Sequence, residues 1–105
     1  VEINLSALPL IDGAMQTVEM GILSSLQPAN VRLKRAIANQ AEAANSPLYP
    51  LVFDPQTSGG LLASLPANRA DECLKALQQQ GYGQAAIIGR VKPQGVVIEP
   101  VTLIS

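Results

Sequence analysis

The sequence predicts an α+β domain in which a mixed sheet is layered with helices. Three observations lead to this prediction. Apolar and polar residues alternate over residues 1–5, a one-sided apolar stripe runs over residues 68–80, and two strand-favouring segments, residues 85–89 and 96–98, follow near the carboxy end. Because the last two segments are joined by a short turn, the sheet should contain at least one antiparallel pair.

The first half of the chain should hold one strand and two helices. Val1, Ile3 and Leu5 alternate with polar residues, which predicts a strand over residues 1–5. Apolar residues at helical spacing predict a helix over residues 11–21. Residues 27–30 should break the chain, with Asn30 as the cap of a second helix. The apolar side of that helix would carry Leu33, Ala36, Ile37 and Ala41.

The second half should hold a strand, a helix and a hairpin. Residues 61–65 are apolar apart from Ser64 and end at Pro66, so a buried strand is expected there. The helix over residues 68–80 has acidic residues in its first turn and Gly81 after its end. Residues 85–89 and 96–98 should then pair as a hairpin, since a Pro and a Gly lie between them.

The composition narrows the possible functions. The 105 residues fit one domain, and seven Lys and Arg against eight Asp and Glu give a net charge of −1, which disfavours nucleic-acid binding. The chain has no His and a single Cys, so a zinc site and His-dependent hydrolysis are excluded within it. No apolar run is long enough for a membrane span, and we expect a cytoplasmic protein. Since Val1 already lies in a strand pattern, we expect an excised fragment.

One segment combines turn-forming residues with groups that can bind an anion. In Asp54-Pro55-Gln56-Thr57-Ser58-Gly59-Gly60, Asp54 can accept backbone hydrogen bonds and the glycines permit backbone angles that other residues avoid. Thr57 and Ser58 add hydroxyls, so the loop is a candidate cradle for a phosphate. It is not a Walker A loop, because no Lys adjoins the glycines. The alternative is a tight turn that only delivers the chain into the next strand.

The same segment carries a family resemblance. Residues 54–62, with their apolar flanks, resemble the signature of the carboxy-terminal domain of selenophosphate synthetases (selenide, water dikinases). Residues 1–14 resemble the opening of that domain, and residues 86–91 resemble the strand after its last long helix. Residues 27–32 depart from the family, which often has a glycine-rich, Arg-containing start to its second helix there.

The resemblance implies that residues 1–105 are a single carboxy-terminal domain, partly ferredoxin-like, of an enzyme related to aminoimidazole ribonucleotide synthetase. That enzyme would convert ATP, selenide and water into selenophosphate, AMP and phosphate. ATP and Mg²⁺ would be bound mainly by an amino-terminal domain that is absent here and is the expected partner. Thr57, Ser58, Gly59 and Gly60 would line the cleft, with no catalytic or metal-binding residue in this chain. The full-length protein is expected to be a homodimer, and the fragment to be inactive alone.

Two alternatives remain at this stage: a free-standing ferredoxin-like binding or regulatory module, and the same domain of a sister enzyme such as aminoimidazole ribonucleotide synthetase. The remaining candidate residues have simpler structural interpretations. Asp54 should cap its loop rather than bind a metal, since a single carboxylate is a weak Mg²⁺ site. The basic face of Arg32, Lys34 and Arg35 should be solvated, and Cys73 should belong to the core.

Overall fold

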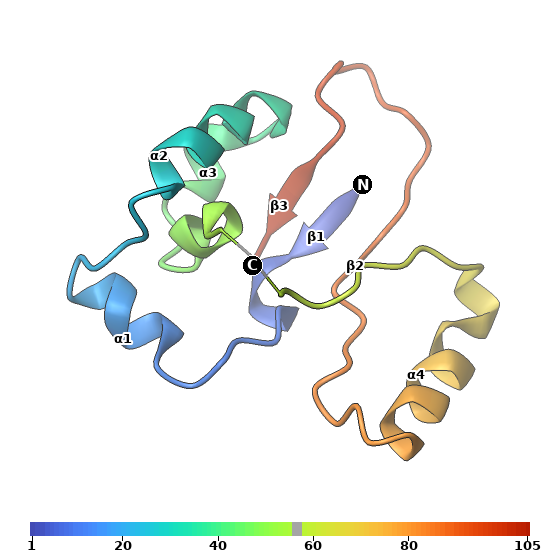
Figure 1. The fold of residues 1–105 in the computed structure, drawn as a ribbon. Helices are drawn as coiled ribbons and strands as arrows, with labels where there is room; N and C mark the ends of the chain where they lie inside the picture. The colour runs from blue at the N-terminus through green and yellow to red at the C-terminus, as the bar shows by residue number, and fades with distance from the viewer. Residues whose placement is uncertain (56–57) are drawn as a thin grey trace.

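A three-stranded mixed sheet lies at the centre of the molecule. The structure, a computed structural model, describes residues 1–55 and 58–105 (Figure 1). Strand β1 (Glu2–Asn4) lies between β2 (Gly89–Arg90), to which it is antiparallel, and β3 (Thr102–Ile104), to which it is parallel. The predicted α+β class and mixed sheet are therefore confirmed.

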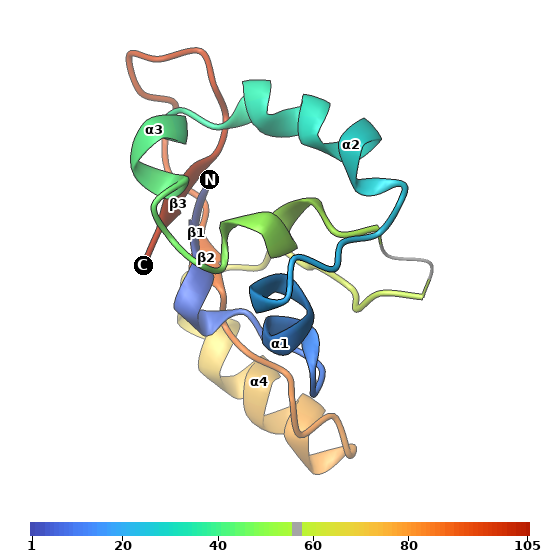
Figure 2. The same cartoon turned by 90° about the vertical axis from the view of Figure 1, so that its left-hand side faces the viewer.

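Short helices account for most of the remaining regular structure. The α-helices are α1 (Ala14–Glu19), α2 (Gln27–Asn30), α3 (Gln40–Ala43) and α4 (Ala70–Gln79). The 3₁₀ helices are η1 (Leu5–Ala7), η2 (Val31–Ala36), η3 (Tyr49–Phe53) and η4 (Ala67–Arg69). Figure 1 shows α4 standing apart from the other α-helices, and Figure 2 shows α2 and α3 at the opposite end of the view from α4. Among residues 1–55 and 58–105, no helix is long and apolar enough to cross a membrane.

The hydrophobic core lies where the sheet meets the helices of the first half of the chain. The buried apolar residues form one cluster: Leu5, Ile37, Ala43, Phe53 and Leu103. Ile3 packs against this cluster, and its neighbours in β1, Glu2 and Asn4, are polar, as expected for alternate residues of a strand with one buried face. Residues 58–98, by contrast, contain no buried residue. The core is therefore built by the first half of the chain together with β3.

Three predicted elements are confirmed. The strand over residues 1–5 is β1, and the helix over residues 11–21 is α1, shorter at both ends. The helix over residues 68–80 is formed by η4 and α4, and Gly81 follows with φ +98°. A left-handed glycine directly after the last turn is the expected way to end a helix.

The second predicted helix was wrong in its bounds. Residues 27–30 do not break the chain but form α2, since Pro28 is tolerated in a first helical turn. Asn30 stands at the N-cap position of η2, but its side chain makes no capping hydrogen bond there, and Leu33 is 59% exposed rather than on an apolar side. Ile37 leaves the helix in an extended conformation and forms a parallel bridge with Val101. Pairing with the chain next to β3 thus interrupts the helical run at the point where Ile37 becomes buried.

The predicted strand over residues 61–65 and the predicted hairpin were also wrong. Residues 61–65 have no strand partner, and Leu61 is fully exposed. The hairpin does not form because Gly89 pairs with β1 instead, and residues 96–98 pair with no strand. A Cβ at Gly89 would overlap the Glu2 carbonyl oxygen, so the glycine permits this close approach. Strand propensity alone does not select a partner strand.

The outer edge of β3 is closed by the segment between α2 and α3. The Asn39 side chain accepts a hydrogen bond from the Leu103 N–H at 3.0 Å and donates one to the Leu103 carbonyl at 2.7 Å. Ala38 N–H donates to the Val101 carbonyl, also at 2.7 Å. The side-chain amide therefore satisfies the backbone of β3 in the way that a neighbouring strand would.

Candidate functional site

The candidate loop begins at the end of η3, where the chain is firmly packed. Phe53 is 4% exposed, and its ring meets Tyr49 edge to face, with ring centres 5.1 Å apart. The Asp54 N–H donates to the Leu51 carbonyl at 3.2 Å, and Asp54 itself is extended and half-buried. The base of the loop is thus fixed up to Asp54. That Asp54 caps the loop stays a prediction.

Two side-chain amides of α2 hold this base from the other side. Gln27 Nε2 donates to the Pro50 carbonyl at 2.7 Å, and Asn30 Nδ2 donates to the Phe53 carbonyl at 3.0 Å. Gln27 is only 5% exposed. Sequence analysis missed both residues as neighbours of the loop. The available signal was a pair of amide side chains three residues apart, which a helix places on one face.

The far part of the loop is open to solvent. Ser58, Gly59 and Gly60 are exposed, whereas Thr57, with Gln56, lies outside the described residues. Gly60 does not have the left-handed backbone that only glycine adopts readily, and a Cβ at this position would meet nothing within 4 Å. Gly60 therefore does not use the backbone freedom that a glycine permits.

The chemistry available at this loop is that of neutral donors. A serine hydroxyl beside two exposed glycines offers O–H and N–H groups without a bulky side chain, which suits contact with an anionic oxygen. Two hollows on the surface lie elsewhere. One lies over the sheet beside Arg90 and Ile104, and the other lies between α4 and the chain before it, beside Leu65 and Cys73. Ser58, Gly59 and Gly60 line neither of them.

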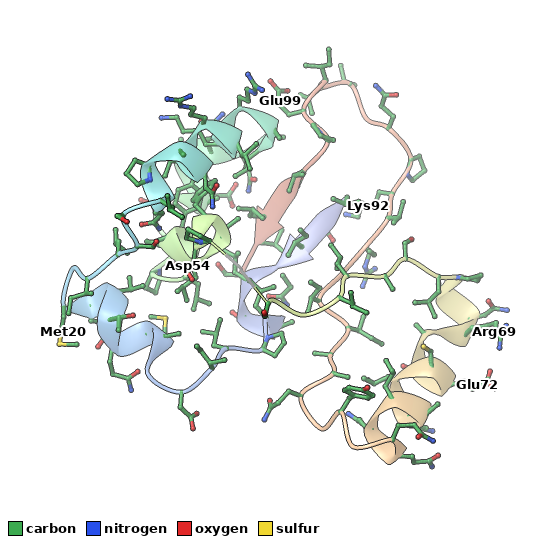
Figure 3. All side chains as sticks on the ribbon, viewed as in Figure 1. Met20, Asp54, Arg69, Glu72, Lys92 and Glu99 are labelled. Atoms are coloured by element: carbon green, nitrogen blue, oxygen red, sulfur yellow. The ribbon has the colours of Figure 1, made fainter. Side chains whose placement is uncertain are left out.

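The charged candidates lie apart from the loop. Arg32, Lys34 and Arg35 are exposed on η2, and none of the three forms an ion pair within the described chain. Figure 3 shows Arg69, at the end of η4, and Glu72, in α4, close together and far from Asp54. Their side chains form an exposed ion pair at 3.8 Å. Lys92 instead pairs with Glu2 on β1.

The remaining candidates lie away from the loop. Cys73 is a free, half-buried cysteine on α4; the expectation that it belongs to the core was wrong, because α4 does not pack into the buried apolar cluster. Arg90 is exposed at the edge of the sheet. In the described ranges, no three His, Cys, Asp or Glu residues lie close enough to hold a metal ion. The arrangement therefore offers anion contacts at the loop and nothing recognisable as a metal centre in the described residues.

Comparison with known proteins agrees with the resemblance of the motif. The chain is 33% identical over 95 residues to a protein of Clostridioides difficile, covering 90% of this chain and 27% of that protein. It is 43% identical over 91 residues to one of Desulfitobacterium hafniense, covering 85% of this chain and 26% of that protein. Both relatives are named selenide, water dikinase. The chain thus spans about a quarter of the length of these relatives.

A family-level comparison covers almost the whole chain. Residues 1–100 match the sequence family described as AIR synthase related protein, C-terminal domain. The matched range includes the sheet strands β1 and β2, every helix and the candidate loop. The chain therefore belongs to the C-terminal domain family of AIR synthase related proteins and is similar, within it, to a part of the selenide, water dikinases.

Proposed function

We propose that this chain is the carboxy-terminal domain of a selenophosphate synthetase. In that enzyme it would complete the cleft in which ATP, selenide and water give selenophosphate, AMP and phosphate. The observation that carries the proposal is the loop from Asp54 to Gly60, which joins a packed base to exposed hydroxyl and amide donors within a chain similar to selenide, water dikinases.

The amount of exposed surface supports a partner domain. The chain exposes 8106 Å², whereas a compact monomer of its mass exposes about 5,600 Å². Much of the exposed surface is apolar, including Leu61, Leu62, Val96 and Ile98, each more than 75% exposed. Association with an amino-terminal ATP-binding domain would bury such surface, because removing apolar groups from water is favourable.

Within the cleft, this chain would bind and orient rather than react. Ser58 and the backbone N–H groups at Gly59 and Gly60 would donate to phosphate oxygens of ATP, and Thr57 would add a second hydroxyl. Mg²⁺ would neutralise phosphate charge when bound. The described residues do not fit a magnesium site, so we assign the metal ligands to the amino-terminal part. The isolated chain is then inactive.

Complementation between separate domains tests the proposal. The chain is mixed with the amino-terminal part of a selenide, water dikinase, and selenophosphate and AMP formation are measured. We expect no product from either piece alone and product from the mixture. Failure of the pieces to bind, together with the absence of turnover in a covalent fusion, would contradict the proposed function.

Removal of the loop hydroxyls tests the phosphate contact. In the full-length enzyme, Ser58→Ala and Thr57→Ala should each lower kcat/KM for ATP about tenfold, since each removes a donor to a charged oxygen worth about 1.5 kcal/mol. Thermal unfolding should hardly change for Ser58→Ala, because Ser58 is exposed. Unchanged kcat/KM in both variants would mean that the loop is only a structural turn and does not contact the phosphates.

A further inference from the structure

Two hydrogen bonds between α2 and η3 share a repeated geometry. Gln27 and Asn30 are three residues apart, and so are their acceptors, the carbonyls of Pro50 and Phe53. Each bond therefore joins residues 23 positions apart in the sequence. Residues three apart lie on one face of a helix, so one turn of α2 lies alongside η3 with a donor opposite each of the two carbonyls.

One of the two acceptors, the Phe53 carbonyl, is left unpaired by its own helix. The last carbonyls of a helix have no partner within it, and burial without a partner is costly. Phe53 ends η3 and is buried, so its carbonyl needs a donor from elsewhere. Asn30 supplies that donor. Gln27 is the buried polar residue of the described chain, and its amide donates to the Pro50 carbonyl within the same helix, η3.

The Phe53 carbonyl belongs to the peptide group that leads into Asp54. Its orientation therefore sets the direction in which the loop leaves η3. The Phe53 ring is held in the core, the Asp54 N–H donates to the Leu51 carbonyl, and the Phe53 carbonyl accepts from Asn30, so both polar atoms of this peptide group are held. Beyond the junction, Ser58 to Gly60 are exposed, and no backbone hydrogen bond to another described residue holds them.

We propose that Gln27 and Asn30 are positioning residues for the loop from Asp54 to Gly60. They touch no substrate and act by fixing the base of the loop, which places Ser58 and the following backbone N–H groups before ATP binds. A preplaced loop loses less conformational freedom on binding, so its contacts contribute more to affinity. This inference rests on the proposed function, because the loop must contact the phosphates for its position to matter.

Asn30→Asp in the full-length enzyme tests the inference. The variant keeps the size of the side chain and removes the N–H donor to Phe53. The matched control is Asn39→Asp, which removes a half-buried amide donor of the same kind from the Leu103 carbonyl, in β3 rather than at the loop. Both variants lose a hydrogen bond, so a general loss of stability affects both.

Two readouts separate positioning from stability. Without ATP, hydrogen exchange at residues 58–60 should be at least threefold faster in Asn30→Asp than in Asn39→Asp. With ATP, kcat/KM should fall about tenfold in Asn30→Asp, mainly through KM, and stay within about twofold of the parent in Asn39→Asp. The double variant Asn30→Asp/Ser58→Ala should lose less kcat/KM than the product of the two single fold-losses, since both changes act through the same contact.

The outcomes distinguish this inference from the proposed function. If Ser58→Ala lowers kcat/KM while Asn30→Asp behaves like Asn39→Asp, the positioning role is overturned and the proposed function stands. If Ser58→Ala changes nothing, the phosphate contact fails and the positioning role fails with it. Equal exchange rates in both Asn variants also overturn the inference. Should Asn30→Asp not fold, Asn30→Ala removes the same donor without introducing a charge, and the same criteria apply to it.

Discussion

Residues 1–54 and residues 58–98 differ sharply in burial although both are rich in apolar residues. The first region packs against β3 and, together with Leu103, contains the entire buried apolar cluster of the described chain. The second region contains the candidate loop, α4 and β2, and none of its residues is buried. Similar apolar residues are therefore buried in one region and exposed in the other. Apolar residues form a core only where another element packs against them.

The largest expected effect comes from comparing one apolar residue in each region. Phe53→Ala should lower the free energy of unfolding by about 3–5 kcal/mol, because it leaves a cavity in the core where Phe53 is 4% exposed. Leu61→Ala should leave it almost unchanged, because Leu61 is fully exposed. Urea unfolding of the chain measures both.

The comparison of Phe53→Ala with Leu61→Ala can be extended by adding the amino-terminal part of the enzyme. If the amino-terminal domain covers residues 58–98, Leu61→Ala should weaken the binding of the two domains. The stability of the isolated chain should still be unchanged by this substitution. A large loss of stability for Leu61→Ala in the isolated chain would break the distinction between the two regions.

The next effect concerns the junction at which the two regions meet. Gly89→Ala should destabilise the chain by about 1–3 kcal/mol, because the added methyl group overlaps the Glu2 carbonyl and forces β2 away from β1. Gly60→Ala is the matched control, with open space around the added group and a backbone that accepts alanine. Thermal unfolding measures the stability of both variants. An equal loss of stability in the two would show that the close approach of Gly89 to the Glu2 carbonyl does not matter for the sheet.

The smallest effect is expected at the surface of α4. Arg69→Ala removes an ion pair with Glu72 whose side chains are 69% and 76% exposed. Such pairs contribute about 0.5 kcal/mol or less, and salt weakens them further. A thermal scan should therefore show a small difference from the parent in low salt and a still smaller one in high salt. A shift comparable to that of Phe53→Ala would mean that α4 is coupled to the core.

The elements predicted correctly are those whose signals are local. The alternation over residues 1–5 and the capped, one-sided helix over residues 68–80 correspond to β1 and to η4 with α4. The errors arose where a distant segment decides the outcome. Gly89 pairs with β1 rather than with residues 96–98, and Ile37 leaves a helix to meet Val101. Pairing over such distances has no signature in a short window of sequence.

For the candidate site, the sequence alone determined the loop: its turn residues, its neutral donors and its family resemblance are all contained in residues 54–62. Only the tertiary structure revealed what holds the loop. Asn30, expected as a helix cap, donates instead to the Phe53 carbonyl, and Gln27 donates to Pro50. The physical reason is that backbone angles and turns depend on neighbouring residues, whereas a buried carbonyl takes whichever donor the fold brings within reach.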